Sequence, residues 1–269
     1  MKDQAIELAR RANDPAAALN ILREYLQAHV LRSLHECEAF STLAFVGDTA
    51  LRFLHNLPRF SEDLDFSLLP NASPNAAVDG RGWLAKVKRD LEFSGFNTEV
   101  TWNAKHTVHN SWIRIAGLLQ DAGLSAHPSQ KLAIKLEIDT RPPDGAVCER
   151  TIITRHLTFL VQHYDLASLF SGKLHALICR PYPKGRDWFD LIWYRSQVPP
   201  VEPNLPLLKN AIEQVGLSKK IATRWKTAVR KRLESFDIKT LANDVRPFLE
   251  HQTGTAIFDK KAILSMLEF

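Results

Sequence analysis

The sequence predicts an α/β (α+β) fold, in which a mixed β-sheet is flanked by helices and a helical part follows at the C-terminus. Two observations carry this prediction. Apolar and polar residues alternate with the period of a strand in residues 63–69 and 131–140, and segments with helical spacing separate them. From residue 164 onward the apolar residues recur almost only at helical spacing. A chain of 269 residues that is 45% hydrophobic can bury a sizeable core in one domain or two.

The composition is that of a modestly basic globular protein. A net charge of +5 and a pI near 9.1 favour an anionic partner such as nucleic acid or a nucleotide, with a simple basic soluble protein as the alternative. The N-terminal residues lack the apolar core of a signal peptide, and no apolar run is long enough for a membrane span. The cysteines are too few and too widely spaced for a disulfide framework or a CxxC site, which fits a cytoplasmic location: Cys37, Cys148 and Cys179.

The first part of the chain is expected to pass from helices into strands. Residues 3–36 divide into two helices, the second capped by Asp14 and beginning at Pro15. STLAFVG, residues 41–47, is expected to be a buried strand that ends at its glycine, and a short helix follows. The strand of residues 63–69 then places an apolar set on one face and a polar set on the other: Leu64, Phe66 and Leu68 against Asp63, Asp65 and Ser67.

A second acidic strand is expected further along. Residues 81–95 suit a helix closed by a glycine, and the strands NTEVTWNA and SWIRIAGLL follow it. In KLAIKLEIDT, residues 131–140, the inward and outward sets alternate again: Ile134, Leu136 and Ile138 against Lys135, Glu137 and Asp139.

The C-terminal part is expected to be helical. After a strand-rich segment at 151–161, helices are predicted at 164–180 and 184–196, and three or four more after a proline-rich connection, in 206–269. A boundary near residue 163 would separate a domain of N-terminal helices and sheet, residues 1–163, from a helical domain, residues 164–269.

The pair Asp63-x-Asp65 is the motif that bears on chemistry. Two-metal phosphoryl or nucleotidyl transfer needs cations about 3.5–4 Å apart that share carboxylate ligands, and alternate strand residues aim theirs at one point. Gly47, at a strand-to-helix turn, would let backbone N–H groups approach a triphosphate. By itself the pair is a weak signal and better suits a solvated edge strand. The order of glycine turn, paired aspartates and third acidic strand favours a metal-dependent transferase.

These segments also resemble a known family, the AbiEii/AbiGii-type nucleotidyltransferase toxins of the DNA polymerase beta-like superfamily. GDTALRFLHNLPRFSEDLDFSL resembles the family motif "GGTALR…RxSxDLDF". KLEID is similar to the family's third-carboxylate strand, and GKLHALICRPYPKGRDWFDLIWY is similar to its later motif "KLxAL…R…RDxxDL". The motifs span residues 40–195, and the helices after residue 200 match only in kind.

The resemblance implies a set of catalytic residues. Asp63 and Asp65 would be the principal metal ligands, with Glu137 as third carboxylate and Asp139 as its alternative. Lys173 would face the triphosphate; the alternative is an exposed lysine on an amphipathic helix. Asp187, helped by Asp190, would orient the attacking hydroxyl or Lys173, the alternative being ordinary pairing with Arg186 or another base.

Nucleotide-binding residues are implied around the glycine turn. Gly47 and Thr49 would contact the phosphates, with Thr49 supplying a hydroxyl. Asp48 stands where the family usually has a second small residue, and it suits a phosphate site if it caps the following helix and points away. Arg52 and Arg59 would hold phosphates bidentately, although Arg52 could equally brace core carboxylates.

The implied activity is transfer of a nucleoside monophosphate from an NTP to an acceptor hydroxyl, with Mg²⁺ or Mn²⁺ as cofactor. By resemblance the acceptor is the 3′ end of tRNA, the protein is the toxin of a toxin–antitoxin system, and its partner is a cognate antitoxin. The helical C-terminal domain would complete the nucleotide cleft. Alternatives are transfer to a protein or small molecule, and a non-catalytic nucleotide- or RNA-binding relative, for which Asp48 is the evidence.

Two further patterns have simple interpretations. The aromatic residues of 188–194 are helically spaced and suit a core better than a base-stacking platform. KKIATRWKTAVRKR, residues 219–232, predicts a positive helix face, either solvated or in contact with an RNA backbone.

Overall fold

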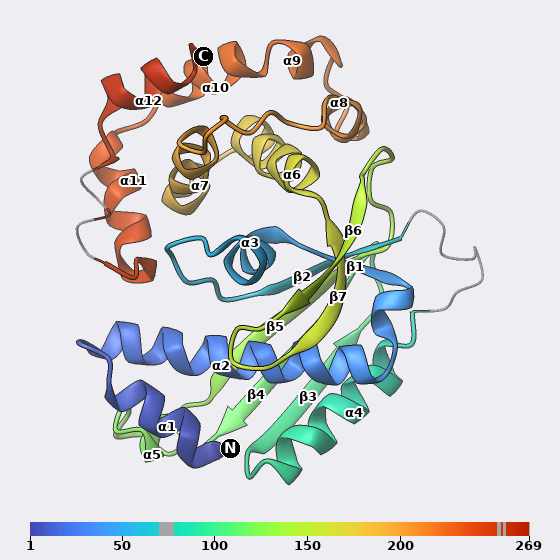
Figure 1. Ribbon diagram of the computed structural model, residues 1–269, viewed down its shortest axis with the longest axis vertical. Coiled ribbons are helices and arrows are strands. Elements are labelled where there is room, and N and C mark those ends of the chain that lie inside the picture. Colours follow the sequence, from blue (N-terminus) through green and yellow to red (C-terminus); the bar gives the residue numbers. More distant parts are fainter. Residues whose placement is uncertain (70–77, 252–253, 255–256, 269) are drawn as a thin grey trace. The chain divides into compact units, whose positions relative to one another are not determined.

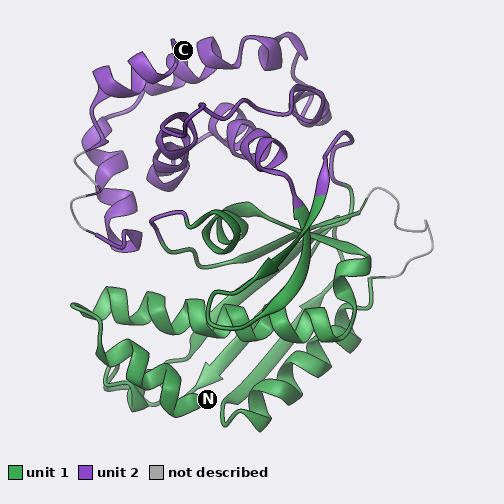
Figure 2. Cartoon of the chain, viewed as in Figure 1, with its two compact units in different colours: residues 1–56, 60–141, 149–163 green, residues 57–59, 142–148, 164–269 purple. Residues whose placement is uncertain are grey.

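The computed structural model describes residues 1–69, 78–251, 254 and 257–268. The chain forms two compact units, which Figure 2 colours separately. Unit 1 comprises residues 1–56, 60–141 and 149–163, and unit 2 comprises residues 57–59, 142–148 and 164–269. The domain division expected from the sequence stays a prediction, while the structure shows that two short earlier segments belong to the helical unit.

A seven-stranded mixed sheet, in the order β3-β4-β5-β2-β1-β7-β6, forms the frame of the fold (Figure 1). Strand β1 pairs antiparallel with β2, and β2 pairs parallel with β5. This sheet with flanking helices confirms the predicted fold class. The strands are β1 (Leu43–Val46), β2 (Leu64–Leu68), β3 (Asn97–Asn103), β4 (Val108–Ala116), β5 (Leu132–Asp139), β6 (Cys148–Ile153) and β7 (Phe159–Tyr164).

One face of the sheet is apolar because the inward sets of β2 and β5 are aligned. Leu64 lies beside Leu136 in the parallel register, and both are almost fully buried. Leu34 and Trp83, from two covering helices, line the same small void as Leu136. The alternation predicted for β5 is confirmed. In β2 it is imperfect, since Ser67 is buried while Leu68 is half-buried.

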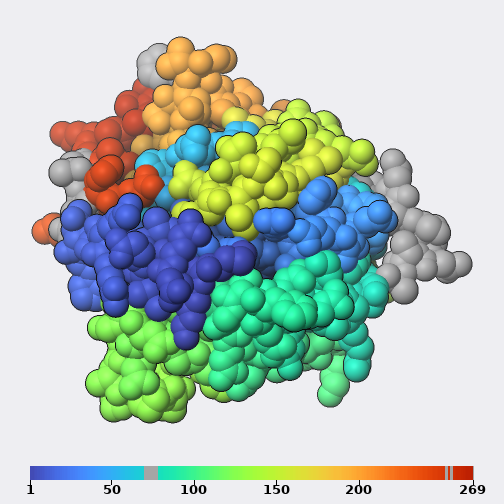
Figure 3. All heavy atoms as spheres, turned by 60° about the horizontal axis from the view of Figure 1, so that its bottom comes forward, coloured from blue at the N-terminus to red at the C-terminus, as the bar shows by residue number. Residues whose placement is uncertain are grey.

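Two helices of unit 1, α2 (Pro15–Glu36) and α4 (Gly80–Phe93), cover that apolar face. The second helix begins at Pro15, and the Asp14 carboxylate accepts a 2.8 Å hydrogen bond from the Ala17 N–H, which confirms the predicted N-cap. Figure 3 shows the surface that the N-terminal helices (dark blue) form beside the segment of α4 (teal). The helices of unit 1 are α1 (Lys2–Arg10), α2 (Pro15–Glu36), α3 (Gly47–His55), α4 (Gly80–Phe93) and α5 (Leu118–Asp121).

Unit 2 is helical apart from its short strand ends (Figure 1). In residues 206–269 the sequence predicts three or four helices, whereas the described part contains five α-helices that begin at or after Leu205. The difference arises where Gly216, at φ +79°, and Arg224, at ψ 31°, interrupt the helical run. The helices are α6 (Leu166–Cys179), α7 (Gly185–Arg195), α8 (Leu205–Gln214), α9 (Lys220–Thr223), α10 (Trp225–Glu234), α11 (Ile238–Val245) and α12 (Lys260–Met266).

The aromatic residues of α7 belong to the core of unit 2. Trp188 and Tyr194 are almost fully buried. Phe170 of α6 stacks on Tyr194 with ring centroids 4.3 Å apart. The predicted core role of this cluster is therefore confirmed. Among the helices described, none has the length and apolar character needed to cross a membrane.

Candidate active site

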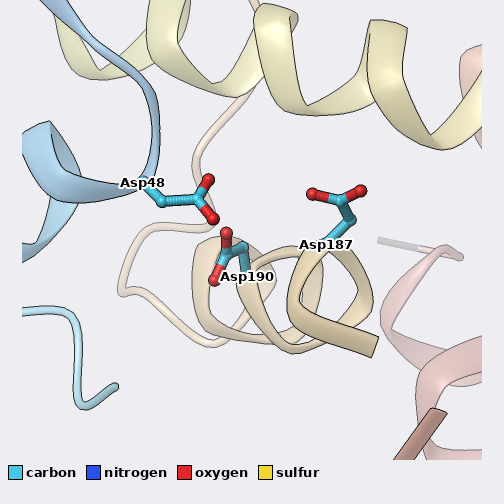
Figure 4. Close-up of side chains that lie close together, drawn as sticks. All are labelled: Asp48, Asp187 and Asp190. Carbon is cyan, nitrogen blue, oxygen red and sulfur yellow. The ribbon is translucent and has the colours of Figure 1, made fainter. Parts of the chain in front are cut away.

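The turn between β1 and α3 brings a glycine against the first acidic strand. Gly47 has φ +77°, and a Cβ there would collide with the carboxylate of Asp65. A side chain at position 47 is therefore excluded by backbone conformation and by the space that Asp65 needs. Asp48 lies in the first turn of α3 (Figure 4), but the N-cap is Val46 and the cap has no side-chain hydrogen bond. Asp48 therefore does not stand at the N-cap position, and a nucleotide contact by Asp48 stays a prediction.

The sheet register places Asp65 between two strands. Across β1 its neighbour is Val46, and across β5 its neighbour is Glu137. Asp139 lies one step further along, beside Ser67. Adjacent strands are about 4.8 Å apart, and residues in register point to the same face. Glu137 is therefore better placed than Asp139 to share a metal with Asp65.

Asp139 has a local partner at the strand end. Its Oδ1 accepts a 2.9 Å hydrogen bond from the backbone N–H of Arg141, which closes the turn after β5. That bond occupies one carboxylate oxygen and gives Asp139 a structural role of its own.

Thr49 ties the start of α3 to the residue that precedes β2. Its hydroxyl donates to the backbone carbonyl of Asp63, and the Thr49 side chain is fully buried. The observed contact holds Asp63 in place. A phosphate contact by Thr49 stays a prediction, and it would have to replace this bond.

Lys135 lies within the acidic cluster, although no motif predicted a role for it. Its Nζ is 2.9 Å from Oε1 of Glu137. This hydrogen bond, together with the charges of Glu137, Asp63 and Asp65, raises the pKa of Lys135. The strand alternation that grouped Lys135 with Glu137 was the signal that could have identified it.

The acidic residues suit a hard divalent cation by their chemistry. Carboxylate oxygens are the ligands that Mg²⁺ and Mn²⁺ prefer. In the described part of the chain, however, the carboxylates of Asp63, Asp65 and Glu137 do not lie within 4.8 Å of one another. Glu137 is ion-paired with Lys135. A cation shared by the three would take the place of the Lys135 ammonium as the partner of Glu137.

Unit 2 holds the second group of predicted residues. Lys173 on α6 contacts Asp187 Oδ1 at 3.0 Å and Asp190 Oδ2 at 2.8 Å. The two aspartates project from adjacent turns of α7 (Figure 4). Arg180 also binds Asp187, and Arg59 binds Asp190. The cluster thus pairs three cations with two carboxylates.

The burial of Lys173 limits which groups its ammonium can bind. Lys173 is only 7% exposed, so the alternative of an exposed lysine on an amphipathic helix is wrong. Lys173 does contact Asp187, while an orienting role for Asp187 toward Lys173 or an attacking hydroxyl stays a prediction. Charges buried in this way are stable only while they are paired. A triphosphate that reached Lys173 would therefore compete with Asp187 and Asp190 for its ammonium group.

The two arginines of the first motif are both buried in ion pairs. Arg52 Nε donates to Glu24 Oε2 at 2.5 Å, and the Arg52 guanidinium lies 4.7 Å from the ring centroid of Phe60. Arg59 is fully buried beside Asp190. Bracing is the role that these contacts give to both residues. Nucleotide contact by either stays a prediction.

Glu24 is the shared partner of Arg52, Arg155 and His156, and these four residues form the Arg52 network. Burial alone would raise the pKa of Glu24, but hydrogen bonds from His156 and Arg52 and the charges of Arg52 and Arg155 lower it to about 2. Arg155 also reaches Asn56 Oδ1 at 2.9 Å, so the network fixes the residue that follows α3. Sequence spacing gave no signal for this network, because its members lie far apart in the chain.

The predicted residues are divided between the two units. In unit 1 these are Gly47, Asp48, Thr49, Arg52, Asp63, Asp65, Glu137 and Asp139, and in unit 2 they are Arg59, Lys173, Asp187 and Asp190. Some residues that form ion pairs with them received no role from the sequence, among them Lys135, Arg180 and Glu24. Arg180 stands in the quoted second motif, which was its available signal.

Comparison with known proteins places the chain in a class. A family profile described as "Nucleotidyl transferase AbiEii toxin, Type IV TA system" matches residues 29–260, which is most of the chain. Fold and profile thus define a protein of the nucleotidyltransferase class. The chain belongs to the AbiEii nucleotidyltransferase toxin family, and the resemblance noted in the motifs is confirmed.

The chain was also compared with solved structures and with curated proteins. The crystal structure of JHP933 from Helicobacter pylori is 19% identical, with 90% of this chain and 93% of that chain covered and a TM-score of 0.45. A putative nucleotidyltransferase from H. pylori is 20% identical, with 92% and 96% covered and a TM-score of 0.45. No curated protein matches the chain.

Proposed function

We propose that this protein is a divalent-metal-dependent enzyme that transfers a nucleoside monophosphate from an NTP to the 3′ hydroxyl of a tRNA, as the toxin of a toxin–antitoxin pair. Membership of the AbiEii family supports the nucleotidyltransferase class. The observation that carries the proposal is the register of β2 and β5, which sets Glu137 beside Asp65 on the polar face of the sheet next to the Gly47 turn.

The residues of unit 1 would hold the cofactor. Asp63, Asp65 and Glu137 supply the oxygen ligands, and the Gly47 turn supplies backbone N–H groups at the start of α3, where negative charge is favoured. Bound divalent cations would lower the pKa of the acceptor hydroxyl and stabilise the departing pyrophosphate. Thr49 keeps Asp63 in position through its bond to the Asp63 carbonyl.

The proposed reaction is an in-line displacement. The acceptor oxygen forms a bond to the α-phosphorus while the bond from that phosphorus to the β-phosphate oxygen breaks. Pyrophosphate leaves, and the hydroxyl proton passes to water. Lys173 would offset negative charge on the phosphates, and Asp187 would orient its ammonium group through the 3.0 Å contact.

A basic surface on unit 2 supports an RNA acceptor. Residues 217–233 contain seven lysines and arginines and no acidic residue. Trp225, Val229 and Leu233 bury one side of α10, so the opposite side faces solvent. Three exposed cations of this segment make no ion pair with any described residue: Lys220, Arg224 and Lys231. Unpaired surface cations are the groups that bind phosphate backbones.

The wider setting follows from the same proposal. The family description names a type IV toxin–antitoxin system, so we expect a cognate antitoxin protein to oppose the activity. The cytoplasm, which contains both NTPs and tRNA, is the proposed location. Co-expression with a candidate antitoxin should restore growth that the toxin alone arrests.

The direct test is label transfer. Purified protein is incubated with Mg²⁺, total tRNA and each α-labelled NTP in turn, beside Asp63→Asn and Asp65→Asn variants and an EDTA control. We expect label on RNA with one or more nucleotides, and its loss in all three controls. Label on the protein, or on an added hydroxylated small molecule, would replace the proposed acceptor.

A second candidate is a non-catalytic nucleotide- or RNA-binding protein. One observation favours it: among the described residues the carboxylates of Asp63, Asp65 and Glu137 do not all lie within 4.8 Å of one another, and Glu137 is paired with Lys135. This candidate predicts no label transfer from folded protein and RNA binding that is unchanged by Asp63→Asn. The two candidates are therefore separated by the same set of variants.

A further inference from the structure

The polar face of the sheet continues past the metal carboxylates onto β4 and β3. Asn110 lies beside Glu137 in the antiparallel register, and Trp112 lies beside Lys135. On the far side Trp112 faces Thr101 of β3. Because Lys135 is bonded to Glu137, one row of side chains connects Trp112 to the acidic cluster. All of these residues belong to unit 1.

Trp112 has an unusual setting for a tryptophan. The core side of β4 is supplied by Ser111, Ile113 and Ile115, which are buried and point the other way. On its own face Trp112 is half-buried, and its strand neighbours are polar or charged. It therefore contributes little to the core, and part of its ring is accessible.

Two cations flank the ring. The guanidinium of Arg114 lies 5.4 Å from the ring centroid of Trp112, and Nζ of Lys135 lies 6.0 Å from it. An accessible aromatic ring between cations can stack a base and also attract the adjoining phosphates. Thr101 and Asn103, both exposed, add hydrogen-bonding groups on the neighbouring strand.

From these contacts we infer that Trp112 is the stacking platform for the terminal base of the single-stranded acceptor, with Arg114 on the adjoining phosphate. The inference rests on the proposed function and names the surface of unit 1 that holds the RNA end. Strand β4 is two strands from β2 in the sheet order, about 10 Å away. A base stacked on Trp112 thus leaves its ribose hydroxyl within reach of Asp63 and Asp65.

The test measures binding without chemistry. Anisotropy of a short 5′-labelled single-stranded RNA is recorded in EDTA for the wild type, Trp112→Ala, Trp112→Phe and the control Trp193→Phe. We expect Trp112→Ala to weaken RNA binding by about 5- to 150-fold, since one base–aromatic stack is worth about 1–3 kcal/mol. Trp112→Phe should keep most of the affinity, and Trp193→Phe should match the wild type.

A second measurement does not depend on the variant's folding. Wild-type protein is titrated with the same RNA carrying an abasic 3′-terminal nucleotide, and this loss of the base should weaken binding to a similar extent. NTP binding, measured by equilibrium dialysis, should not change in Trp112→Ala. Equal affinity for the intact and abasic RNA, or a loss confined to NTP binding, would overturn the inference. RNA binding that depends on the terminal base, without label transfer, would support Trp112 as the stacking platform and reject the proposed catalysis.

Discussion

Arg59 donates two hydrogen bonds to Asp190, from Nε to Oδ1 at 2.6 Å and from Nη2 to Oδ2 at 2.5 Å. Neither side chain is exposed to solvent. The pair belongs to unit 2 and fixes the segment 57–59 against α7. Asp190 also contacts Lys173, so the position of the proposed phosphate-binding lysine depends on the same carboxylate.

Removing one member of this pair should destabilise the protein. Arg59→Gln leaves Asp190 buried with only part of its charge compensated, and breaking a buried pair typically costs about 3–5 kcal/mol. Urea unfolding should show this loss for Arg59→Gln and for Asp190→Asn, with a double variant that loses less than the sum. A nucleotide-contact role for Arg59 predicts the contrary result, unchanged stability with a raised KM.

Gly47→Ala should abolish activity and reduce stability. The new methyl group would meet the Asp65 carboxylate, and alanine is strained at φ +77°. Gly172→Ala is the matched control, because nothing lies within 4 Å of a Cβ at that helical position and the change favours the helix by up to about 1 kcal/mol. Label transfer and thermal unfolding of both variants check this. Full activity in Gly47→Ala would contradict the placement of Asp65 over the turn.

Glu137 and Asp139 should differ in their effect on metal binding. Glu137 is beside Asp65 in the sheet register, whereas Asp139 is bonded to the Arg141 backbone. We expect Glu137→Gln to weaken Mn²⁺ binding by at least tenfold and Asp139→Asn to leave it nearly unchanged, as measured by calorimetry. The reverse order would make Asp139 the third ligand.

Substitution of Lys135 should change Mn²⁺ affinity in the direction opposite to Glu137→Gln. Its ammonium group neutralises Glu137 in the structure, so Lys135→Met should raise Mn²⁺ affinity and lower the stability of the metal-free protein. Both effects follow from removing one positive charge from a group of carboxylates. If Lys135→Met instead weakens Mn²⁺ binding, Lys135 supports the bound cation through another contact.

The basic surface of α9 and α10 should set the salt dependence of RNA binding. Each of Lys220, Arg224 and Lys231 that contacts a phosphate contributes about 0.7 to the slope of log affinity against log salt for a single strand and about 0.9 for a duplex. Triple substitution by alanine should lower the slope by about 2–3. Lys219→Ala is the control, since Lys219 is paired with Glu213 at 2.7 Å. An unchanged slope would show that this surface is only solvated.

The sequence alone predicted most strands and helices, because apolar residues recur with the period of two in a strand and with helical spacing in a helix. The alternation in KLAIKLEIDT predicted the buried set of β5, and Asp14-Pro15 predicted the start of α2. The turn at Gly47 and the strand that carries Asp65 were predictable because each lies in a motif that coincides with an element, while the roles of these residues in a site stay predictions. Pairings between distant positions were not: Arg59 with Asp190 and Arg52 with Glu24 depend on tertiary packing that no local period records.

Stability should fall as the pH drops from about 6.5 to about 4, through His29. This residue lies in α2, is 6% exposed, and its Nε2 has no hydrogen-bond partner among the described residues. Burial, with smaller contributions from Arg32 and other charges, lowers the pKa of His29 from 6.5 to about 4. Between these values the unfolded chain binds a proton that the folded chain does not, so stability is complete above pH 6.5 and is lost toward pH 4.

His29→Leu should remove the contribution of His29 to the pH dependence of the free energy of unfolding, which is about 3 kcal/mol between pH 6.5 and pH 4. Burial and the charge of His163 also lower the pKa of His55 to about 4. The His29→Leu variant should therefore keep the part of the stability-versus-pH slope that His55 contributes. Urea unfolding at a series of pH values measures the slope, and exposed His127→Gln serves as the control. A His29→Leu slope equal to that of the wild type would mean that His29 takes up its proton in the folded state as readily as in the unfolded chain.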